Sequence, residues 1–431
     1  MKRNALALAL VLVLLGSLTI GVLAQEQVEV VARVKPLIQV DGLLFKDLNA
    51  NGELDPYEDW RLPVDERVEN LVSLMTLEEK AGAMFHPKLP VPLDGSIDTK
   101  PVDLTLKGDI MYDPYTYIHD LKIINLLNNG VAPPATFARW SNDIQEIAES
   151  TRLGIPIMFS TDPRHGAVLG AHVKGNQYFS QWPSREGQLG LAATRNIDLV
   201  REFGRVVAEE YRAVGLHMIL GPQIDLVTEP RWGRNAGCWS ESAELTAEMT
   251  VAFLEGLGVK DPKNGALAMV KHWPGAGPHE KGFQNPRVES FLVYPGDNLE
   301  YHLLPFRAAF EAGATATMPY YSFMEGETYP LSYSQYAIQE LLREHLGFDG
   351  VACTDWGVTD WAAAGDARDL TMKERFEMCI NAGIDQFGMP TNEGISDWAW
   401  ERRVRPDLIV DLVHEGRISE ERINESVKRI L

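Results

Sequence analysis

The sequence predicts a single α/β domain, a (β/α)8 barrel, preceded by a signal peptide and a short N-terminal extension. Three observations predict this fold. The 431 residues are enough for one large α/β domain or two ordinary ones. From about residue 155 onward, short apolar runs end in a polar or charged residue, and a helical segment follows each of them. Strands that alternate with helices in this way indicate a parallel sheet.

Residues 1–24 are predicted to be a secretory signal peptide. Met1-Lys2-Arg3 is basic, the run from Ala5 to Ile20 is almost wholly apolar, and Val22-Leu23-Ala24 fits a small-residue cleavage site. A membrane anchor is the alternative, but the run is short for a span, and no Cys follows it to carry a lipid. We therefore expect a secreted protein, periplasmic or extracellular, with no later membrane span.

Residues 25–64 form the extension, which contains a 12-residue loop, 47–58, with the spacing of an EF-hand. Oxygen-bearing side chains fall at loop positions 1, 3, 5 and 9, glycine at 6, a backbone carbonyl at 7 and glutamate at 12. Hard cations need such oxygen clusters, so we expect a structural Ca²⁺, with a metal-free surface loop as the alternative. The expected ligand residues are Asp47, Asn49, Asn51, Glu53, Asp55 and Glu58.

The barrel is expected over residues 65–431. Strands are predicted near 155–162, 217–220, 266–270, 315–318, 351–353 and 384–389, with two more around 81–84 and 122–127. Apolar residues at helical spacing predict helices at 197–214, 243–257, 299–310, 336–346 and 372–380. Ser419 is expected to cap a last helix. Eight strands favour the closed barrel, with a doubly wound open sheet as the alternative.

Polar residues follow several of these strands at once. The run at 217–220 leads to Asp225, and others end at Asp162, Lys271, His272, Tyr321 and Asp355. The active site of a (β/α)8 barrel lies at the carboxyl ends of its strands. We therefore expect the last five side chains to converge on one pocket. The alternative is that each residue merely ends a strand and is solvated. It becomes less plausible as more residues share this position.

Charge and cysteine content narrow the classes of function. The net charge of −21 argues against nucleic acid or an anionic membrane as a partner and is compatible with a neutral substrate. The three cysteines are Cys238, Cys353 and Cys379, and their spacing does not suggest a zinc site. Cys353 lies in an apolar run, where a free thiol behaves as a small hydrophobic side chain.

Five segments, in order, resemble glycoside hydrolase family 3, the retaining β-glucosidase and related exo-glycosidase family. They are residues 67–84, residues 150–166, Glu229-Pro-Arg-Trp-Gly-Arg234, Lys271-His-Trp-Pro-Gly275 and Gly350-Val-Ala-Cys-Thr-Asp-Trp356. The resemblance covers residues 65–431. It implies an enzyme that removes terminal β-linked sugars from oligosaccharides, polysaccharides or glucosides, with glucose as the default sugar. No cofactor for catalysis is expected.

The resemblance also implies a role for each matching residue. Asp355 resembles the catalytic nucleophile, Trp356 an aromatic wall, and Tyr321, or its neighbour Tyr320, the tyrosine beside the nucleophile. The residues expected to hold the hydroxyls of the terminal sugar are Asp162, Arg234, Lys271 and His272. A structural ion pair is the alternative for Lys271 and His272. Trp182 is expected to be a structural loop residue rather than part of a sugar subsite.

The chemistry supports such a set independently of the resemblance. Glycoside hydrolysis passes through an oxocarbenium-like transition state, so a carboxylate must attack or stabilise the anomeric carbon. Cations and hydrogen-bond donors near that carboxylate keep it ionised. Asp355 can be the carboxylate, and Arg234, Lys271 and His272 can be the donors.

The chain departs from the family pattern at the general acid. A retaining enzyme needs two carboxyl groups about 5–5.5 Å apart. Most family members take the acid from a second domain, and single-domain members use an Asp-x-His pair in the loop after the Lys-His strand. Here that loop, residues 275–286, contains His279 and Glu280 but no Asp-x-His, which also argues against an N-acetylglucosaminidase. We expect the acid to come from a second domain or partner chain rather than from His279 or Glu280.

Three functions are compatible with these observations. The chain is the barrel of a secreted β-glycosidase, a sugar-binding barrel that has lost hydrolysis, or a metal-dependent hydrolase on the same barrel. The third has the least support, because no strand-end group of His and Asp has metal-ligand spacing. Asp355 with its cationic neighbours favours the first.

Overall fold

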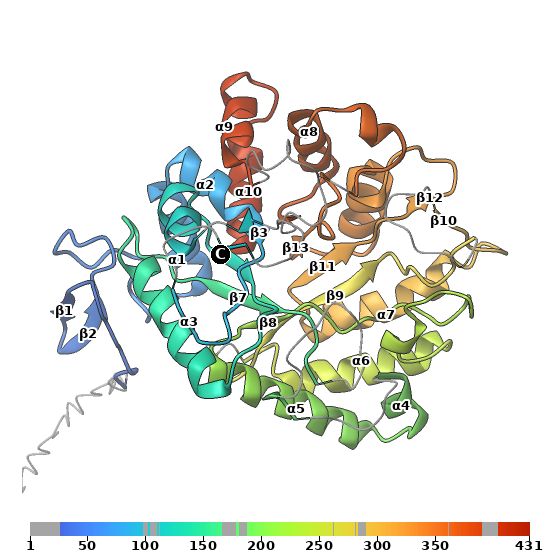
Figure 1. Ribbon diagram of the computed structural model, residues 1–431, viewed down its shortest axis with the longest axis horizontal. Coiled ribbons are helices and arrows are strands. Elements are labelled where there is room, and N and C mark those ends of the chain that lie inside the picture. Colours follow the sequence, from blue (N-terminus) through green and yellow to red (C-terminus); the bar gives the residue numbers. More distant parts are fainter. Residues whose placement is uncertain are drawn as a thin grey trace, which may run out of the picture.

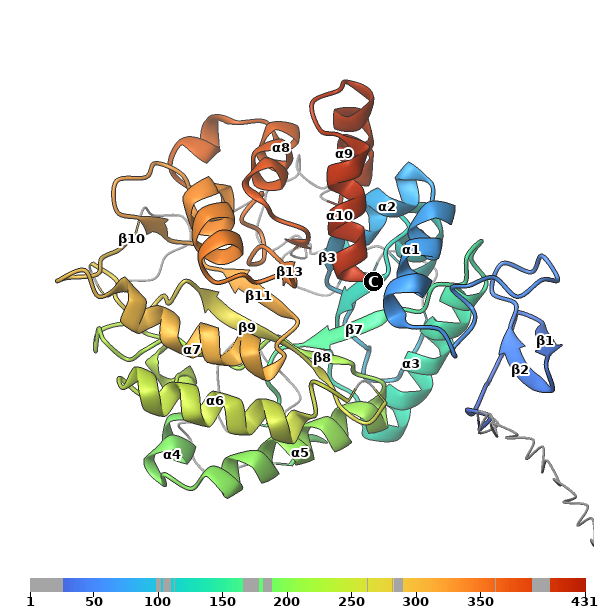
Figure 2. The ribbon, with the colours of Figure 1, turned by 180° about the vertical axis from the view of Figure 1, so that it is seen from behind.

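The computed structural model describes residues 26–97, 102–103, 110–111, 113–165, 178–180, 188–261, 263–280, 282, 290–360, 362–389 and 404–431. The predicted signal peptide, Trp182 and residues 283–289 lie outside these ranges. Helices surround a ring of parallel strands and follow one another around it in chain order (Figure 1). The same ring is seen from behind in Figure 2.

Two groups of parallel strands make up the ring in the described part of the chain. One has the order β13-β11-β9-β8-β7-β6, and the other pairs β14 with β3. Bridges from Lys88 to Leu127 and from Cys353 to Gln386 join the two groups and close the barrel. The bounds are β3 (Phe85–Pro87), β6 (Asn125–Leu127), β7 (Met158–Thr161), β8 (Met218–Ile219), β9 (Leu267–Trp273), β11 (Ala316–Pro319), β13 (Val351–Ala352) and β14 (Phe387–Met389). The predicted (β/α)8 barrel is therefore confirmed.

The helices agree closely with the predicted periodicity. The α-helices are α1 (Val64–Leu74), α2 (Leu77–Ala83), α3 (Pro134–Glu149), α4 (Gln188–Ala193), α5 (Ile197–Val214), α6 (Ala243–Leu257), α7 (Leu299–Ala312), α8 (Met372–Ala382), α9 (Pro406–His414) and α10 (Glu420–Ile430). The segment predicted at 336–346 is a π-helix, η5 (Tyr336–His345). Ser419 caps α10 as predicted, since its hydroxyl accepts the N–H of Arg422. Within the described ranges, no helix has the length and apolar character needed to cross a membrane.

One strand prediction, at 81–84, is wrong, because these residues end helix α2 and strand β3 begins at Phe85. The Thr76 hydroxyl accepts the N–H of Glu79, and the Glu79 carboxylate accepts the N–H of Thr76. This capping box starts a helix that carries the apolar residues of the run. Short apolar runs of this kind fit a buried helix end as well as a strand.

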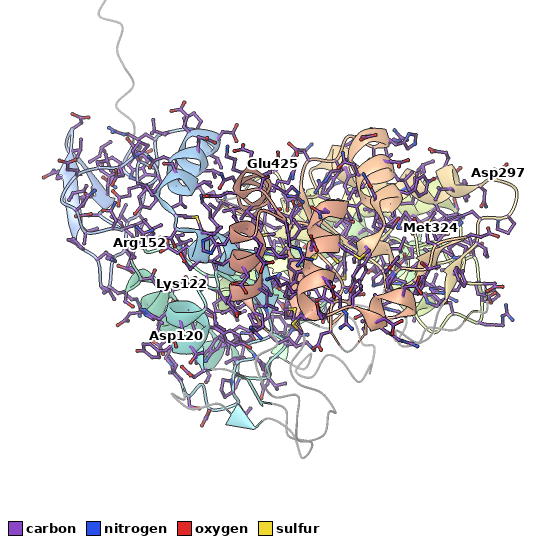
Figure 3. The ribbon with its side chains drawn as sticks, turned by 90° about the horizontal axis from the view of Figure 1, so that it is seen from above. Asp120, Lys122, Arg152, Asp297, Met324 and Glu425 are labelled. Carbon is purple, nitrogen blue, oxygen red and sulfur yellow. The ribbon has the colours of Figure 1, made fainter. Side chains whose placement is uncertain are left out.

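Shorter elements lie in the connections. They are β4 (Val102–Asp103), β5 (Ile110–Met111), β10 (Phe291–Leu292), β12 (Phe323–Met324), the π-helix η1 (Thr116–Asp120) and the 3₁₀ helices η3 (Asn235–Gly237), η4 (Leu331–Tyr333) and η6 (Gly365–Asp369). Strands β10 and β12 pair in parallel. Seen from above, Met324 and Asp297 lie at the end of the molecule opposite to the N-terminal extension (Figure 3).

The extension folds as a β-hairpin that is attached to helix α3. Strands β1 (Leu37–Val40) and β2 (Leu43–Lys46) are antiparallel, and both residues of the turn, Asp41 and Gly42, have positive φ. Asp-Gly is a favoured pair for such a turn. At the end of α3, the buried Glu149 carboxylate accepts the backbone N–H of Arg33, Val34 and Lys35 at 3.0, 3.1 and 2.9 Å. One carboxylate thus fastens the extension to the barrel.

The barrel interior is filled by an apolar cluster that contains three methionines, Met218, Met269 and Met318, with Cys353 and Trp356. A second, larger cluster fills the layer between the strands and the helices. Cys353 is fully buried, as predicted for a small hydrophobic residue, and the three cysteines are free thiols.

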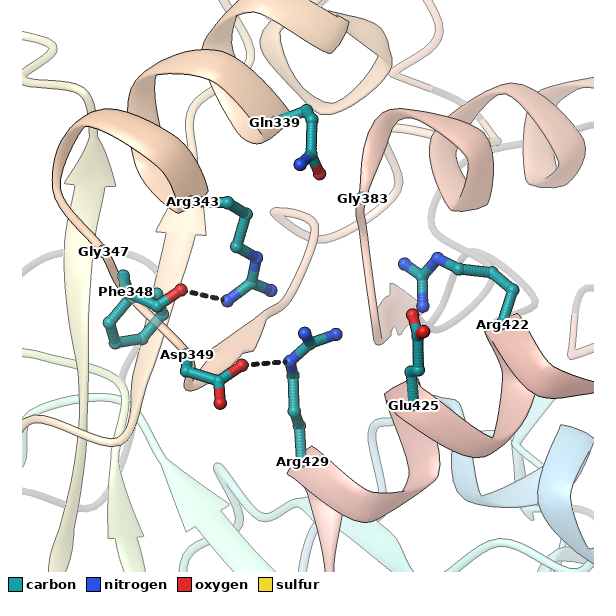
Figure 4. Close-up of a pocket in the computed structure, with 9 residues that line it drawn as sticks. All are labelled: Gln339, Arg343, Gly347, Phe348, Asp349, Gly383, Arg422, Glu425 and Arg429. Atoms are coloured by element: carbon teal, nitrogen blue, oxygen red, sulfur yellow. Dashed lines mark hydrogen bonds and ion pairs between the residues drawn. The ribbon is translucent and has the colours of Figure 1, made fainter.

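The N-terminal face of the barrel carries a buried ionic cluster around Asp385, just before β14. The Asp385 carboxylate accepts from Arg343 at 2.6 Å, Arg429 at 3.2 Å and Ser426 at 2.8 Å, and from the backbone N–H of Ala352 at 3.0 Å. Beside it, a cavity of about 350 Å³ is lined by Arg343, Arg422, Arg429, Asp349 and Glu425, among others (Figure 4). Helices η5 and α10 supply the three arginines, so the cluster ties the last helix to the barrel.

Candidate active site

The predicted site residues are brought together at the C-terminal ends of the barrel strands. Asp162 directly follows β7, and Lys271 and His272 lie near the end of β9. Tyr321 comes two residues after β11, and Asp355 three residues after β13. The segment after β8 contributes Arg234, which the strand pattern alone did not place. Contacts between these residues, given below, show that they form one cluster.

Asp355 is buried, with 7% of its surface exposed. Its Oδ1 accepts the backbone N–H of Trp356 at 2.7 Å. Its Oδ2 is buried and has no hydrogen-bond partner among the described residues. Burial raises the pKa of Asp355, against the opposing charges of Arg234 and Lys271. The Asp355 carboxylate thus has one oxygen with free lone pairs, and its burial disfavours the ionised form.

Two cations, Lys271 and Arg234, lie among the carboxylates of this site. Lys271 donates from Nζ to Oδ1 of Asp162 at 3.1 Å, and Asn129 donates to Oδ2 of Asp162 at 2.8 Å. Burial tends to raise the pKa of Asp162, but Lys271 and Asn129 outweigh it and lower that pKa to about 2. Asp162 is therefore ionised at neutral pH. Burial opposes the charge of Arg234, yet Tyr320 and Asp355 raise its pKa above the ordinary value.

His272 is fully buried and paired with a buried carboxylate, Asp225. The two side chains meet at 2.8 Å, between Nδ1 of His272 and Oδ2 of Asp225. The other oxygen, Oδ1, accepts the backbone N–H of His272 at 3.1 Å and of Ala276 at 2.6 Å. Burial, with the charges of Arg234 and Lys271, lowers the pKa of His272 well below its ordinary value. His272 is therefore a neutral imidazole.

Two tyrosines line the other side of the cluster. The Tyr321 hydroxyl donates to the carbonyl of Trp356 at 2.8 Å, and burial and the Asp355 charge raise the pKa of Tyr321. The ring centres of Tyr320 and His272 lie 4.5 Å apart, and the Arg234 guanidinium lies 5.7 Å from the Tyr320 ring centre. The two tyrosines thus share the positions that the sequence left open between them: Tyr321 beside Asp355, and Tyr320 between His272 and Arg234.

Trp356 lies over the apolar cluster in the barrel interior, with 7% of its surface exposed. Its ring contacts His86 edge-on at 5.3 Å. A Cβ on Gly388 would lie 2.8 Å from the Trp356 ring and 2.7 Å from the carbonyl of Thr354, so only glycine fits there. Trp356 is therefore packed into the apolar interior of the barrel.

Several polar atoms around this cluster are buried without a hydrogen-bond partner among the described residues. They are Asp355 Oδ2, His272 Nε2, Tyr320 Oη, His279 Nε2 and Trp356 Nε1. Buried polar atoms in folded proteins nearly always have partners. A polyhydroxylated ligand, which carries both donors and acceptors, would supply them.

Two residues of this cluster received no role from the sequence. Asn129 lies just after the neighbouring strand β6 and donates to Asp162 Oδ2, and its own Oδ1 accepts the N–H of Asp162 at 3.1 Å. Asp225 follows a predicted strand, as the other site residues do, and this signal was available. Its role depends on His272, 47 residues further on, which spacing along the chain does not reveal.

Three described carboxylates in the strand-end segments are each paired with another side chain and do not supply an evident general acid. Asp162 is paired with Lys271, Asp225 with His272, and Glu229 with Arg231. His279 bonds through Nδ1 to the Ser290 hydroxyl at 2.7 Å, and burial with the Arg234 charge lowers its pKa to about 4. A neutral His279 is too weak an acid to protonate a leaving group at neutral pH. Glu280 is exposed.

The EF-hand-like loop adopts the predicted turn. Gly52, at loop position 6, has φ +82°, and the Asp47 carboxylate accepts the N–H of Asn51 and Gly52 at 3.0 and 2.9 Å. Glu58, at position 12, is buried, and burial raises its pKa. Asn49 and Asn51 both donate to Asp55. The oxygen donors suit a hard cation, although no three His, Cys, Asp or Glu side chains in the described ranges gather closely enough to hold a metal ion.

Comparison with known proteins places this cluster in context. The family model described as "Glycosyl hydrolase family 3 N terminal domain" matches residues 76–431. The chain is 38% identical to a "Periplasmic beta-glucosidase/beta-xylosidase" of Dickeya chrysanthemi, over 95% of this chain and 64% of the relative. It is 41% identical to "Beta-glucosidase C" of Emericella nidulans, over 90% of this chain and 62% of the relative. The chain thus spans just over three fifths of the length of these relatives.

Solved structures of β-glucosidases are also similar to this chain. The chain is 25% identical to a β-glucosidase from Erythrobacter marinus, with a TM-score of 0.69 over 87% of this chain and 45% of that one. It is also 25% identical to a β-glucosidase from Listeria innocua in complex with isofagomine, with a TM-score of 0.65 over 85% of this chain and 45% of that one.

Proposed function

Because the chain belongs to glycosyl hydrolase family 3, we propose that it is the barrel of a secreted, retaining, exo-acting β-glycosidase. Its substrate class is terminal β-linked glucose or xylose in oligosaccharides, polysaccharides or simple glycosides. One observation carries the proposal furthest. Asp355 is a buried carboxylate at the end of a barrel strand, with one oxygen unpartnered among the described residues and two cations acting on it.

In the proposed reaction, Asp355 Oδ2 attacks the anomeric carbon as the bond from that carbon to the leaving oxygen breaks. The leaving oxygen takes a proton from a general acid, and a covalent glycosyl-enzyme remains. Water then attacks the anomeric carbon, gives its proton to the same group acting as a base, and releases Asp355. Arg234 and Lys271 stabilise the ionised Asp355. Asp162, Lys271 and His272 hold hydroxyls of the terminal sugar.

We propose that the general acid comes from a second domain or partner chain. Two facts support this. Three described carboxylates in the strand-end segments, Asp162, Asp225 and Glu229, are paired with other side chains. The chain also covers 64% and 62% of the two relatives above. The same facts favour one alternative, a barrel that binds sugars but needs a partner for hydrolysis.

Covalent trapping separates the two. We expect incubation with an activated 2-deoxy-2-fluoro β-glucoside to add one sugar to the intact mass of the protein. A good leaving group needs no general acid, so the reaction depends on the nucleophile alone. The 2-fluoro β-xyloside tests the second sugar. Intact mass spectrometry, followed by peptide mapping, should locate the adduct on Asp355.

The matched control is Asp366→Asn, since Asp366 is an exposed aspartate on η6. This variant should label like the wild type, whereas Asp355→Asn should not label at all. If neither fluoro-sugar labels the wild type but sugars still bind, the sugar-binding alternative replaces the glycosidase.

We also propose that the protein is exported, to the periplasm or the cell exterior. Two observations support this. Residues 1–24 have the composition of a signal peptide. A relative that matches 95% of this chain is named periplasmic.

For loop 47–58 we propose structural Ca²⁺ binding. Calcium should then raise the melting temperature by a few degrees relative to EDTA, because a ligand at 100 times its Kd stabilises the fold by about 2.7 kcal/mol. Differential scanning calorimetry measures the shift. Glu58→Gln should remove it, while Asp366→Asn should keep it. Equal melting temperatures in Ca²⁺ and EDTA, with no heat of binding in titration calorimetry, would leave the loop metal-free.

A further inference from the structure

Asp225 and His272 form a pair whose chemistry goes beyond holding the loop together. We propose that Asp225 is a positioning residue that fixes His272 as the Nδ1–H tautomer, so that His272 Nε2 accepts a hydrogen bond from a sugar hydroxyl. The hydroxyl part of this inference rests on the proposed function. The tautomer part rests on the geometry of the pair alone.

The first step is the position of Asp225. The segment after β8 runs beside β9, where the N–H of Ile224 donates to the carbonyl of Lys271 at 2.7 Å and Gln223 bridges to Lys271. Asp225, one residue further on, is fully buried. Its carboxylate is therefore held against the end of β9 by backbone pairing.

The second step is the charge of Asp225. Burial raises the pKa of Asp225, to about 6, against the two backbone N–H groups that Oδ1 accepts and the charges of Arg234 and Lys271. The carboxylate is thus ionised at neutral pH. An ionised carboxylate only accepts hydrogen bonds.

The third step is the proton on His272. The Asp225 carboxylate favours the imidazolium, but burial and three neighbouring groups, Arg234, Lys271 and His279, disfavour it, and the pKa of His272 is lowered well below its ordinary value. A neutral imidazole carries one N–H. Nδ1 lies 2.8 Å from Oδ2 of Asp225, which can only accept, so the N–H is on Nδ1. Nε2 then carries a lone pair.

The surroundings of His272 Nε2 determine what it can bind. It is buried without a partner among the described residues, as is Oδ2 of Asp355 in the same cluster. An unmade hydrogen bond at a buried atom costs about 1–3 kcal/mol. The adjacent Lys271 presents N–H donors, and one of them already binds Asp162. Lys271 thus offers a hydrogen-bond donor and His272 Nε2 an acceptor. A sugar hydroxyl can use both, whereas a group without a proton to donate cannot bind to Nε2.

The tautomer can be measured on the protein without any substrate. Long-range ¹H–¹⁵N spectra of histidine-labelled protein distinguish the two neutral forms for each of the ten histidines. His272→Gln assigns the signals. At pH 7 we expect His272 to be neutral with the proton on Nδ1. A wild-type spectrum with the proton on Nε2, or on both nitrogens, overturns the proposal, even if Asp225→Asn misfolds.

Asp225→Asn tests the cause. The asparagine oxygen can still accept the two backbone N–H groups, while its NH₂ faces Nδ1 and moves the imidazole proton to Nε2. We expect this tautomer change and a fall in kcat/KM of at least about 10²-fold with an activated aryl β-glucoside. Asp59→Asn, at a buried carboxylate of the extension, is the control and should leave the His272 signals unchanged. An unchanged His272 tautomer in folded Asp225→Asn contradicts the role of Asp225.

Binding of modified glucoses tests the direction of the hydrogen bond. A deoxy sugar lacks the hydroxyl, and a deoxyfluoro sugar keeps a weak acceptor but no donor. At the position that faces His272, both should bind about tenfold more weakly than glucose. In Asp225→Asn the fluoro sugar should regain affinity over the deoxy sugar. If the fluoro sugar binds the wild type more tightly than the deoxy sugar at every position, His272 Nε2 is not a hydrogen-bond acceptor and the proposal is overturned. Failure of glucose itself to bind contradicts the proposed function and not the tautomer.

Discussion

Replacing Asp355 by asparagine is expected to lower kcat/KM for a dinitrophenyl β-glucoside by on the order of 10⁴- to 10⁶-fold, the scale seen when an enzyme loses its nucleophile. The amide cannot form the glycosyl ester, and the leaving group needs no acid. Stopped-flow or steady-state release of dinitrophenol measures the loss. Asp366→Asn should retain wild-type rates.

The same substitution should leave the protein at least as stable as the wild type. Burial raises the pKa of Asp355 in the folded state, so the fold disfavours its ionised form. The resulting loss of stability is absent below the unfolded-state pKa and fully present above the raised folded-state pKa. The gain from asparagine should therefore be largest at neutral pH and shrink as the pH falls. A variant that is markedly less stable than the wild type at pH 7 would make Asp355 a structural residue.

Replacing Asp385 by asparagine should have the largest effect on stability, a loss of about 3–5 kcal/mol in the free energy of unfolding. Its carboxylate is the buried counter-ion shared by Arg343 and Arg429, with Arg422 at 3.6 Å. Without it, three guanidinium groups face one another. The drop should be visible by urea unfolding and as a lower melting temperature.

Asp349→Asn is the matched control for this cluster. Asp349 pairs with the same Arg429 at 3.0 Å, but its side chain is 87% exposed. Exposed ion pairs contribute about 0–1 kcal/mol. Both variants should keep wild-type trapping by the fluoro-glucoside at low temperature, because the cluster lies at the opposite face of the barrel. Equal destabilisation by the two substitutions would show that burial of Asp385 does not matter.

The helices were predictable because their ends are set locally. Helices α5 and α6 have the predicted bounds, since Asn196 and Ser242 cap their first turns and Gly215 and Gly258 end them in the left-handed conformation. The strands depend on partners far away in the chain. The apolar run at 81–84 predicts a strand but ends a helix, because the feature that decides it, the reciprocal bonding of Thr76 and Glu79, lies upstream of the apolar residues.

The site was predictable where a residue's position after a strand is enough. Asp162, Lys271, His272 and Asp355 share that position, and parallel strands bring their ends to one face. Asp225 has the same position, but its role is a contact with His272. Trp356, the expected aromatic wall, packs over the barrel interior, because Gly388, 32 residues later, leaves room for its ring there. Such contacts arise only when the barrel closes.

The pairing of β3 with β14 has a consequence for how this chain is made. Residues 85–87 pair with residues 387–389, so the first strand of the ring must wait for the last. Until the ribosome has released that last strand, β3 and β13 are open edges of a parallel sheet. Open edges are templates for pairing with other chains, and long-range parallel pairing is slow. Nascent and truncated chains that stop before β14 are therefore expected to need protection by chaperones, and the barrel should form as a unit only after β14 has left the ribosome.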